Sequence, residues 1–412
     1  MTASLALTVG SPAEPAALQT TVLDSFGGDG LSAELWDEHI QRTGASLYLT
    51  YDWCRIWWRH YGNGRRLRIY VFRQESRLVG LAPMFVETVR LGPIGLRTAK
   101  RVGADSAMAV FSLPILPDSA EAVFRALITD LVGNEGCEAL CFGSVPGDDS
   151  ALDTLRALCG TLRTDISVAR DAPTGVQSVF HLPSTFEAYL GQLGKSQRQN
   201  YRRQLRQLQT ELGCTSSIVT NPFEARSVFR TFSAMHERQW QAEGKLGHFG
   251  DWPASEAFNR DLVDTFSRSG RMRFHRLAID GEFVAIQYAF VIAGHCNWRL
   301  TARVPELRYG RFGLGVLGLV QLIDAMIAEG VSQIDGGVGH YDYKLRYGAE
   351  EQEIRSFVII PSRRSAALKA GLFLRAADLL HFLYYRIWFL RLAPRLGMPR
   401  RPLWRLWIRS RL

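Results

Sequence analysis

The order of predicted secondary structure repeats along this chain, and the repeat restricts the fold more than any other feature of the sequence. Apolar residues with a period of two indicate strands, and those with a period of 3.6 indicate helices. Each copy reads hairpin, strand, helix, strand, the first at 67–89, 109–116, 119–132 and 137–142 and the second at 271–292, 296–304, 314–328 and 331–335. The sequence therefore predicts an α/β protein with a duplicated unit of about 170 residues, the alternative being two unrelated α/β domains.

The repeat also sets the expected domain limits. The chain has 412 residues, of which 47% are hydrophobic and 22% charged, as in a folded protein with two or three domains. We expect four parts, namely a disordered N-terminus at 1–20, a first domain at 21–183, a second at 184–362 and a tail at 363–412.

Positive charge is concentrated in the tail. The formal net charge is +9, but the tail alone contributes +11, because it holds twelve Lys/Arg residues and one acid, Asp378. The remaining 362 residues carry a net charge of −2. Basicity is therefore a local feature, and no DNA partner is predicted.

The six cysteines show no CxxC pair and no metal-ligand spacing, so we expect buried thiols and no metal site. The N-terminal stretch MTASLALTVGSPAEP lacks the cationic and apolar regions of a signal peptide. Free thiols without an export signal predict a cytoplasmic protein.

The stretch DGGVGHYDYKLRYG, residues 335–348, is the most unusual in the chain. Three glycines in five positions are followed by several side chains that exchange or orient protons. We take four of them as candidate catalytic residues: Asp335, His340, Tyr343 and Lys344. The alternative is a polar loop after a strand.

The order hairpin, strand, helix, strand resembles the GCN5-related N-acetyltransferase (GNAT) fold, in which these elements enclose acyl-CoA and the pyrophosphate lies at the helix N-terminus. There, free backbone N–H groups and the helix dipole stabilise phosphates. The resemblance implies a CoA thioester site in the second half, with the expected contacts Arg308, Arg311, Phe312, Gly313, Leu314 and Gly315. The corresponding stretch of the first half, LPDSAEAVF, has no glycine.

The second half as a whole resembles the CelD/BcsL-type acetyltransferases, tandem-GNAT proteins assigned to cellulose and other exopolysaccharide pathways. The shared features are HERQWQAEGKLGHFG at 236–250, the hairpin, the FGLG junction and the pattern D-x-x-x-G-x-x-x-Y-K that ends at Lys344. The first half is similar in its helix with Trp53, Trp57 and Trp58. That family is itself similar to the Fem peptidyltransferases, which move amino acids from aminoacyl-tRNA onto peptidoglycan precursors.

Acyl transfer from a thioester to an amine requires that the amine lose a proton, that the carbonyl oxygen be stabilised and that the thiolate gain a proton. We expect Asp335 or His340 to take the proton and Tyr343 to donate one to sulfur. Lys344 is expected to hold a phosphate or a developing oxyanion. Otherwise Asp335 caps a turn, the tyrosines pack and Lys344 is solvated.

Two further segments are candidates for acceptor binding. His236 and Trp240 are four residues apart on one helix face, and the resemblance places them on the acceptor side. The alternative is a core histidine beside an anchoring tryptophan. Arg198 and Arg202 belong to a basic stripe that would grip a nucleotide-linked or lipid-linked acceptor or a tRNA acceptor stem, unless it is simply a solvated face.

The tail contains no run of 18 apolar residues, so no transmembrane helix is predicted. Arg364, Arg375 and Arg386 are eleven residues apart and share one helix face, with aromatic and aliphatic residues on the others. This pattern predicts a basic amphipathic helix on an anionic inner leaflet. The alternative is a helix packed back over the domain with its arginines in water.

The sequence thus predicts an acyl-CoA-dependent acyltransferase that modifies an amine or hydroxyl of a sugar-linked or lipid-linked precursor of the cell envelope or of an exopolysaccharide. We expect it in the cytoplasm, peripherally attached to the inner membrane face. A Fem-like transferase that uses aminoacyl-tRNA and a non-catalytic, membrane-tethered assembly subunit are the alternatives.

Overall fold

The computed structural model describes residues 17–27, 30–44, 46–105, 110–244, 247–251, 253–306, 309–401 and 403–412. Most of the segment expected to be disordered, residues 1–16, lies outside the described residues. The end of the segment 1–20 is not disordered as predicted, because strand β1 (Leu18–Leu23) begins there and pairs antiparallel with β2.

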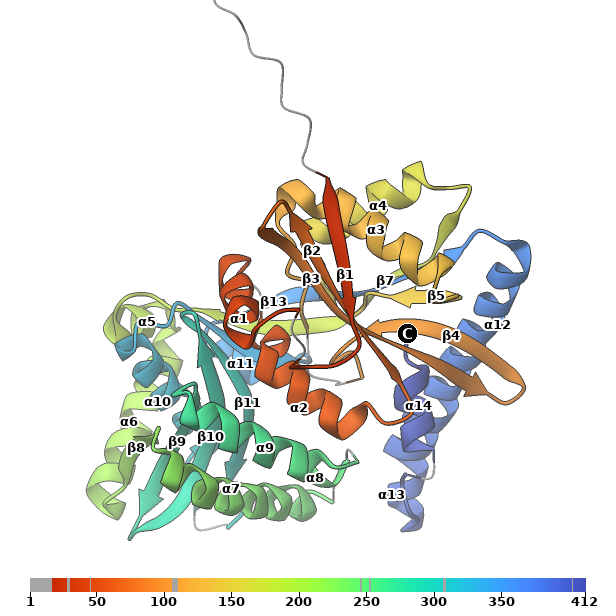
Figure 1. Cartoon of the computed structure of the whole chain (residues 1–412). Helices are drawn as coiled ribbons and strands as arrows, with labels where there is room; N and C mark the ends of the chain where they lie inside the picture. The colour runs from red at the N-terminus through yellow and green to blue at the C-terminus, as the bar shows by residue number, and fades with distance from the viewer. Residues whose placement is uncertain are drawn as a thin grey trace, which may run out of the picture.

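One mixed sheet runs through the described part of the molecule (Figure 1). Its strands, in spatial order, are β1, β2 (Arg66–Gln74), β3 (Arg77–Leu91), β4 (Ile94–Arg101), β5 (Ala139–Cys141), β13 (Ala349–Pro361), β7 (Ile166–His181), β12 (Gln333–Val338), β11 (His295–Arg303), β10 (Glu282–Ile292), β9 (Met272–Ile279) and β8 (Thr215–Val219). The short β6 (Val145–Pro146) pairs with β13. The pairs β4–β5 and β11–β12 are parallel, and each needs a crossover helix, α3 (Ala120–Gly133) or α10 (Leu314–Ala328).

Each half therefore contains a hairpin, a third strand, a crossover helix and a parallel fourth strand, which confirms the predicted duplicated α/β fold. The third strand of the first half is β4 and not 109–116, so that prediction is wrong. Of the described residues 110–116, Ile115 forms only an isolated bridge with Gly80. The sequence hid β4 because it carries Lys100 and Arg101, whose side chains are buried despite their charge.

The two halves exchange strands at the centre of the sheet. β13, from the second half of the sequence, pairs with β5 of the first, with Val358 opposite Cys141. β7, from the first half, pairs with β12 of the second, with Phe180 opposite Ile334. β7 and β13 also pair with each other along most of their length. The expected domain limit at 183–184 falls in the connection after β7, but the sheet is continuous across it.

Helices cover both faces of this sheet. One apolar cluster is shared by the two halves and is covered by α1 (Ala33–Arg42), α2 (Tyr51–Tyr61), α7 (Pro222–Ala242) and α9 (Ser255–Arg268). In it, Trp53 of α2 meets Phe258 of α9 edge-on, with ring centroids 5.9 Å apart. The other faces are covered by α3 and α4 (Ser150–Thr161) in the first half and by α5 (Phe186–Gln192), α6 (Lys195–Leu212) and α10 in the second. The remaining short helices are η1 (Leu47–Leu49), η2 (Pro117–Ser119), α8 (His248–Asp251) and α11 (Asp342–Arg346).

The tail packs against the first half and consists of α12 (Arg364–Leu380), the π-helical segment η4 (His381–Leu392), α13 (Ala393–Leu396) and α14 (Trp404–Ser410) (Figure 1). Phe373 and Leu374 of α12 join an apolar cluster that includes Leu96, Val358 and Ile360. The structure thus has the packed arrangement that was the alternative for this segment, while Arg364, Arg375 and Arg386 are exposed. Among the helices of the described chain, none is long and apolar enough to cross a membrane.

A buried ion cluster fixes the end of the tail to the first half. The Lys100 Nζ lies 3.3 Å from Glu87 Oε1 and 3.2 Å from Asp105 Oδ1, and Arg65 pairs with the same two acids. Lys100 also donates a hydrogen bond of 2.6 Å to the carbonyl oxygen of Arg409, in the last turn of α14. Buried charges are tolerated when they are paired and hydrogen-bonded, and the tail adds one hydrogen bond and one ion pair, from Arg409 to Glu87 at 3.4 Å, to this cluster.

The packing of α12 can be tested with two neighbouring residues. Phe373 is 0% exposed and Leu372 is 47% exposed. Phe373→Ala should lower the free energy of unfolding by about 3–5 kcal/mol, because it leaves a cavity. Leu372→Ala, on the solvent side of the same helix, should change it by less than about 0.5 kcal/mol. Urea unfolding of the full chain measures both, and equal effects would show that α12 does not cover the body in solution.

Candidate functional site

A cavity of about 1030 Å³ lies where the parallel strands of the second half separate. β11 and β12 pair only from His295–Asn297 to Gln333–Asp335, and beyond Asp335 β12 pairs with β7 alone. The walls of this cavity come from β11, from the glycine loop and α11, from α7, α8 and α9, and from the tail. We call it the second-half cavity.

Lys344 of α11 lies in the wall of this cavity, although it is only 4% exposed. Its Nζ donates a hydrogen bond of 2.7 Å to the Gly336 carbonyl oxygen. It also lies 4.3 Å from the Tyr341 ring centroid and 5.7 Å from that of Trp298. Burial lowers the pKa of Lys344 to about 8, although the negative charge of Asp335 acts in the opposite direction. About a tenth of this amine is therefore uncharged at pH 7, far more than for an ordinary lysine.

Asp335 holds the glycine loop in place. Its Oδ1 accepts a hydrogen bond of 2.8 Å from the backbone N–H of Gly337, and its Oδ2 accepts one of 3.0 Å from the Asn297 side chain. Burial raises the pKa of Asp335, while the hydrogen bonds from Gly337, Gln177 and Asn297 oppose this shift. Gly337 has φ +81°, a conformation that glycine adopts without strain.

The structure brings Tyr343 to the cavity but not His340. Tyr343 lines the wall beside Lys344, and burial raises its pKa to about 12, so the phenol keeps its proton. His340 is exposed and is not among the residues that line the cavity. Its Nδ1 lies 2.7 Å from Glu351 and its Nε2 lies 3.2 Å from Asp342, and the hydrogen bond to Glu351 raises its pKa.

His236 and Trp240 both line the cavity, as does His248 of α8, which the sequence analysis did not single out. His236 Nδ1 is 2.9 Å from the Thr301 carbonyl oxygen, which can only accept, so this nitrogen carries the proton. His236 Nε2 then accepts from His248 Nδ1 at 2.9 Å. Burial lowers the pKa of His236 to about 4 and that of His248 to about 3, so both rings are neutral at physiological pH.

Arg299 and Thr301 of β11 also line the cavity and were missed. The Arg299 Nε donates a hydrogen bond of 2.9 Å to Asn259 Oδ1. Its Nη1 and the Thr301 Oγ1 are buried and have no hydrogen-bond partner among the described residues. The arginine in the otherwise largely apolar strand CNWRLTARV could have indicated Arg299. The sequence does not show, however, which residues of that strand line the cavity.

The expected phosphate loop lies at the start of α10, away from the lining of the cavity. Phe312 and Leu314 are buried, and Arg308 lies outside the described residues. A Cβ added at Gly313 or Gly315 would meet its nearest atoms, in Gln204 and Arg303, at 3.6 and 3.7 Å, so small side chains fit there.

Helix α6 lies over the same loop. Gln204 Oε1 accepts a hydrogen bond of 3.4 Å from the Gly313 N–H, and Glu211 forms an ion pair of 2.8 Å with Arg311. A phosphate at this loop has backbone N–H groups and a cation available, but it must compete with Gln204 and Glu211 for them.

Arg198 and Arg202 are not brought to the cavity. Arg198 donates to the Leu190 carbonyl oxygen at 3.3 Å, and Arg202 forms a 2.8 Å ion pair with Glu187, so both bind the neighbouring helix α5. The six cysteines are buried free thiols, as predicted. Within the described ranges, no group of three or more His, Cys, Asp or Glu side chains could hold a metal ion.

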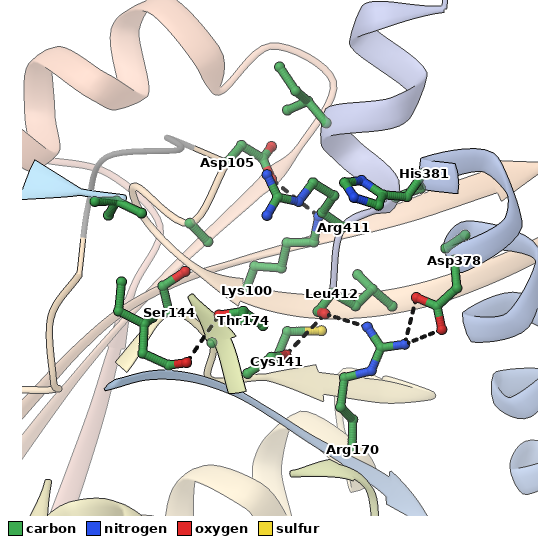
Figure 2. Close-up of a pocket in the computed structure, with 18 residues that line it drawn as sticks. Lys100, Asp105, Cys141, Ser144, Arg170, Thr174, Asp378, His381, Arg411 and Leu412 are labelled. Atoms are coloured by element: carbon green, nitrogen blue, oxygen red, sulfur yellow. Dashed lines mark hydrogen bonds and ion pairs between the residues drawn. The ribbon is translucent and has the colours of Figure 1, made fainter. Parts of the chain in front are cut away.

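The first half has a smaller counterpart of the cavity, about 250 Å³, at the end of its own parallel pair, where Lys100 lies opposite Cys141. Residues of the tail line one side of this first-half cleft (Figure 2). The Leu412 backbone oxygen accepts hydrogen bonds from Ser356 Oγ at 3.0 Å and from Arg170 at 3.3 Å, and Arg170 also pairs with Asp378 at 2.8 Å. The tail thus forms part of the wall of both cavities.

The side chains that the tail contributes to the second-half cavity are aromatic and cationic. Tyr385 of η4 stacks on Trp407 of α14, with ring centroids 4.5 Å apart and an interplanar angle of 9°. Arg386, Arg391 and Arg411 line the same wall.

Comparisons with known proteins agree with this architecture. Residues 195–345 match the family model "Acetyltransferase (GNAT) domain". The fold is similar to that of FemX, with a TM-score of 0.61 and 11% identity over 82% of this chain and 98% of that chain. A conserved protein of unknown function from Bacteroides thetaiotaomicron VPI-5482 has a TM-score of 0.50 and 12% identity over 82% of this chain and 100% of that chain. No curated protein matches the sequence.

The matched segment runs from the start of α6 into α11, and it therefore includes the expected phosphate loop, β11, the glycine loop and Lys344. The second half of this chain carries an acetyltransferase domain of the GNAT superfamily, within a fold like that of FemX.

Proposed function

We propose that this protein is an acyltransferase in which Lys344 is the general base that takes a proton from an amine acceptor. The observation that carries the proposal is a buried lysine with a lowered pKa, in the wall of a large cavity where the strands of a GNAT domain separate. Buried lysines with lowered pKa values are suited to proton abstraction near neutral pH.

The proposed reaction joins the acyl carbon of a thioester to the acceptor nitrogen and breaks the bond from that carbon to sulfur. The proton that the nitrogen loses goes to the uncharged amine of Lys344. The thiolate that leaves takes a proton from Tyr343, whose raised pKa of about 12 keeps it protonated until then. Asp335 acts as a positioning residue, because its hydrogen bonds fix the glycine loop whose Gly336 carbonyl oxygen orients Lys344.

We propose acyl-CoA as the donor, with its phosphates at the start of α10 near Arg311 and Gly313. Gln204 and Glu211 of α6 already bind these groups, which favours a second candidate. That candidate is a Fem-like transferase whose donor is an aminoacyl-tRNA and which binds no phosphate at this loop. Binding of acyl-CoA or of charged tRNA to the purified full chain separates the two. Binding of neither donor would favour a non-catalytic assembly subunit.

For the acceptor we propose a sugar-linked or lipid-linked envelope or exopolysaccharide precursor, reached at the inner face of the membrane. The support lies in the tail, where ten large apolar side chains are exposed among the arginines: Leu368, Leu372, Leu379, Phe382, Leu383, Leu390, Leu392, Leu396, Met398 and Leu403. Exposed apolar groups interspersed with arginines suit an interface with anionic lipid.

The pH dependence of turnover tests the role of Lys344. If the uncharged amine is the base, kcat/KM should rise with pH, with its midpoint near pH 8, and level off once Lys344 has lost its proton. Lys344→Met should reduce turnover by about 100-fold and abolish that rise. Asp335→Asn should lower turnover and move the inflection to lower pH, because the negative charge of Asp335 raises the pKa of Lys344. A rate that falls above pH 8 would mean that the charged ammonium acts instead.

The donor site is tested by two substitutions with opposite expected effects. Arg311→Ala should weaken acyl-CoA binding by about 1.5–3 kcal/mol, the contribution of a charge-assisted hydrogen bond. Glu211→Gln should strengthen it, since it removes the carboxylate that pairs with Arg311. Titration calorimetry with acetyl-CoA measures both, and unchanged affinity in both variants would exclude this loop as the phosphate site.

Membrane attachment is tested with the full chain, because removal of the tail would uncover the core. Phe382 and Leu383 are 54% and 50% exposed, and the double variant Phe382→Ser, Leu383→Ser should sediment less with vesicles that contain anionic lipid. Phe223→Ser is the control, since Phe223 is 94% exposed but lies outside the tail. Binding of the unaltered protein should fall as salt rises. Equal sedimentation of all three proteins would contradict the proposal.

A further inference from the structure

We propose that His248 determines acceptor specificity, because its Nε2 accepts a hydrogen bond from a neutral hydroxyl group of the acceptor. This inference rests on the proposed function and narrows its acceptor to a hydroxyl-bearing molecule such as a sugar. His248 is the first residue of α8 and lines the second-half cavity. Its hydrogen-bond partner His236, on α7, lines the same cavity.

A chain of hydrogen bonds fixes the tautomer of both rings. The Thr301 carbonyl oxygen can only accept, so His236 Nδ1 carries the proton and His236 Nε2 is left as an acceptor. His248 Nδ1, which lies 2.9 Å from that Nε2, must therefore carry a proton of its own. Because a neutral imidazole has one protonated nitrogen, His248 Nε2 holds a lone pair and can only accept.

The outer end of this chain is accessible. No described residue donates a hydrogen bond to His248 Nε2, and this atom is not among the buried ring nitrogens without a partner, as Nδ1 of His275 is. His248 is partly exposed, whereas His236 is only 1% exposed. A ligand in the cavity can therefore reach the outer ring of the pair but not the inner one.

His248 lies on the side of the sheet opposite the proposed donor site. Alternate residues of a strand point to opposite faces, and Tyr288 and Phe290 of β10 pack in the apolar cluster that contains Phe249 of α8. Ala289, between them, packs in the cluster that contains Leu314 of α10. In the proposed reaction the donor binds at the start of α10, so the molecule that reaches His248 is the acceptor.

The charge around His248 favours a neutral group over a cation. Among the described residues that line the cavity are four arginines and Lys344, against the single acid Glu243. Burial lowers the pKa of His248 to about 3, and the positive charge of Arg299 acts in the same direction. A cation at this atom would be repelled, whereas a hydroxyl donates a hydrogen bond and brings no charge.

The roles of His248 and Lys344 differ because their pKa values differ. A ring with a pKa of about 3 accepts a hydrogen bond near neutral pH without taking the proton. Lys344, with a pKa of about 8, remains the base of the proposed reaction. His248 thus selects and orients the acceptor, and His236 is a positioning residue that fixes the His248 tautomer.

Trp240 helps to hold the His248 ring. The two rings meet edge-on, with centroids 5.0 Å apart and an interplanar angle of 87°. The same tryptophan lies 5.8 Å from the His236 ring. A ring held between two neighbours loses little conformational freedom when it binds a ligand, so one hydrogen bond can contribute measurably to specificity.

The probes are D-glucose and tetrahydropyran, two neutral six-membered rings that differ in their hydroxyl groups. Calorimetric titration of the full chain measures their binding, and nitrogen NMR of histidine-labelled protein reports the state of the His248 ring. We expect glucose to bind more tightly and to shift the His248 Nε2 resonance, and tetrahydropyran to leave this resonance unchanged.

Two substitutions of His248 isolate the hydrogen bond. His248→Phe keeps a ring but removes the acceptor atom, and it should weaken glucose binding about threefold to tenfold, the loss of one neutral hydrogen bond. His248→Gln places a side-chain oxygen near the position of Nε2 and should restore most of the affinity. His181→Gln, at an exposed histidine outside the cavity, is the control and should change nothing.

The positioning role of His236 has a separate spectroscopic test. His236→Asn keeps a donor for the Thr301 carbonyl oxygen but removes the nitrogen that accepts from His248. The His248 resonances should then change from one tautomer, protonated at Nδ1, to a mixture of two, and glucose binding should weaken. Circular dichroism checks that each variant is folded, and the two His248 variants provide the test if His236→Asn is not.

The outcome is independent of whether the proposed reaction is correct. Lys344→Met should lose turnover and keep glucose binding, so a protein without acyltransferase activity but with His248-dependent binding would refute the reaction and keep the contact. Equal affinity of the unaltered protein for the two probes overturns the contact. So does glucose binding that His248→Phe leaves unchanged, or a His248 ring that carries its proton on Nε2.

Discussion

The pairing of β13 with β7 holds the two halves in one sheet, and the position of the candidate site depends on it. The ladder between these strands runs from Ala349 opposite Phe180 to Pro361 opposite Ile166. Because β12 lies on the far side of β7, the chain that leaves β12 must cross β7 before β13 begins. That crossing is made by the glycine loop and α11, and it is the reason why Lys344 lies at the opening between β11 and β12.

The two halves use buried lysines in opposite ways at corresponding places. Lys100, at the end of the parallel pair of the first half, is paired with Glu87 and Asp105 and donates to a tail carbonyl. Lys344, beside the parallel pair of the second half, donates to a carbonyl and faces aromatic rings, and burial lowers its pKa. The two carboxylates that contact Lys100 keep its amine charged. No carboxylate of the described chain contacts the Lys344 amine directly, so burial lowers its pKa and it can lose its proton near pH 8.

The tail connects these two environments. Its last residue, Leu412, is hydrogen-bonded to Ser356 and Arg170 at the first-half cleft, and Tyr385 and Trp407 of the same tail lie in the wall of the second-half cavity. A segment of this composition looks like an appendage in the sequence because its charge differs from that of the body. In the fold it completes an apolar cluster and a buried ion cluster, while its exposed leucines and arginines remain available for an interface.

The sequence by itself determined the duplicated α/β fold, the crossover helix that begins at Leu314 and the buried cysteines, and it singled out Lys344, which the structure places in the wall of the second-half cavity. These follow from local periodicity and from the residue types at turns, both of which can be read from neighbouring residues in the sequence. The strand exchange, the place of β4, the distance of His340 from the cavity, and the pairing of His248 with His236 were decided by the tertiary structure. Each depends on which strands become neighbours, and that is set by long-range pairing and burial, for which a single sequence carries no local signal.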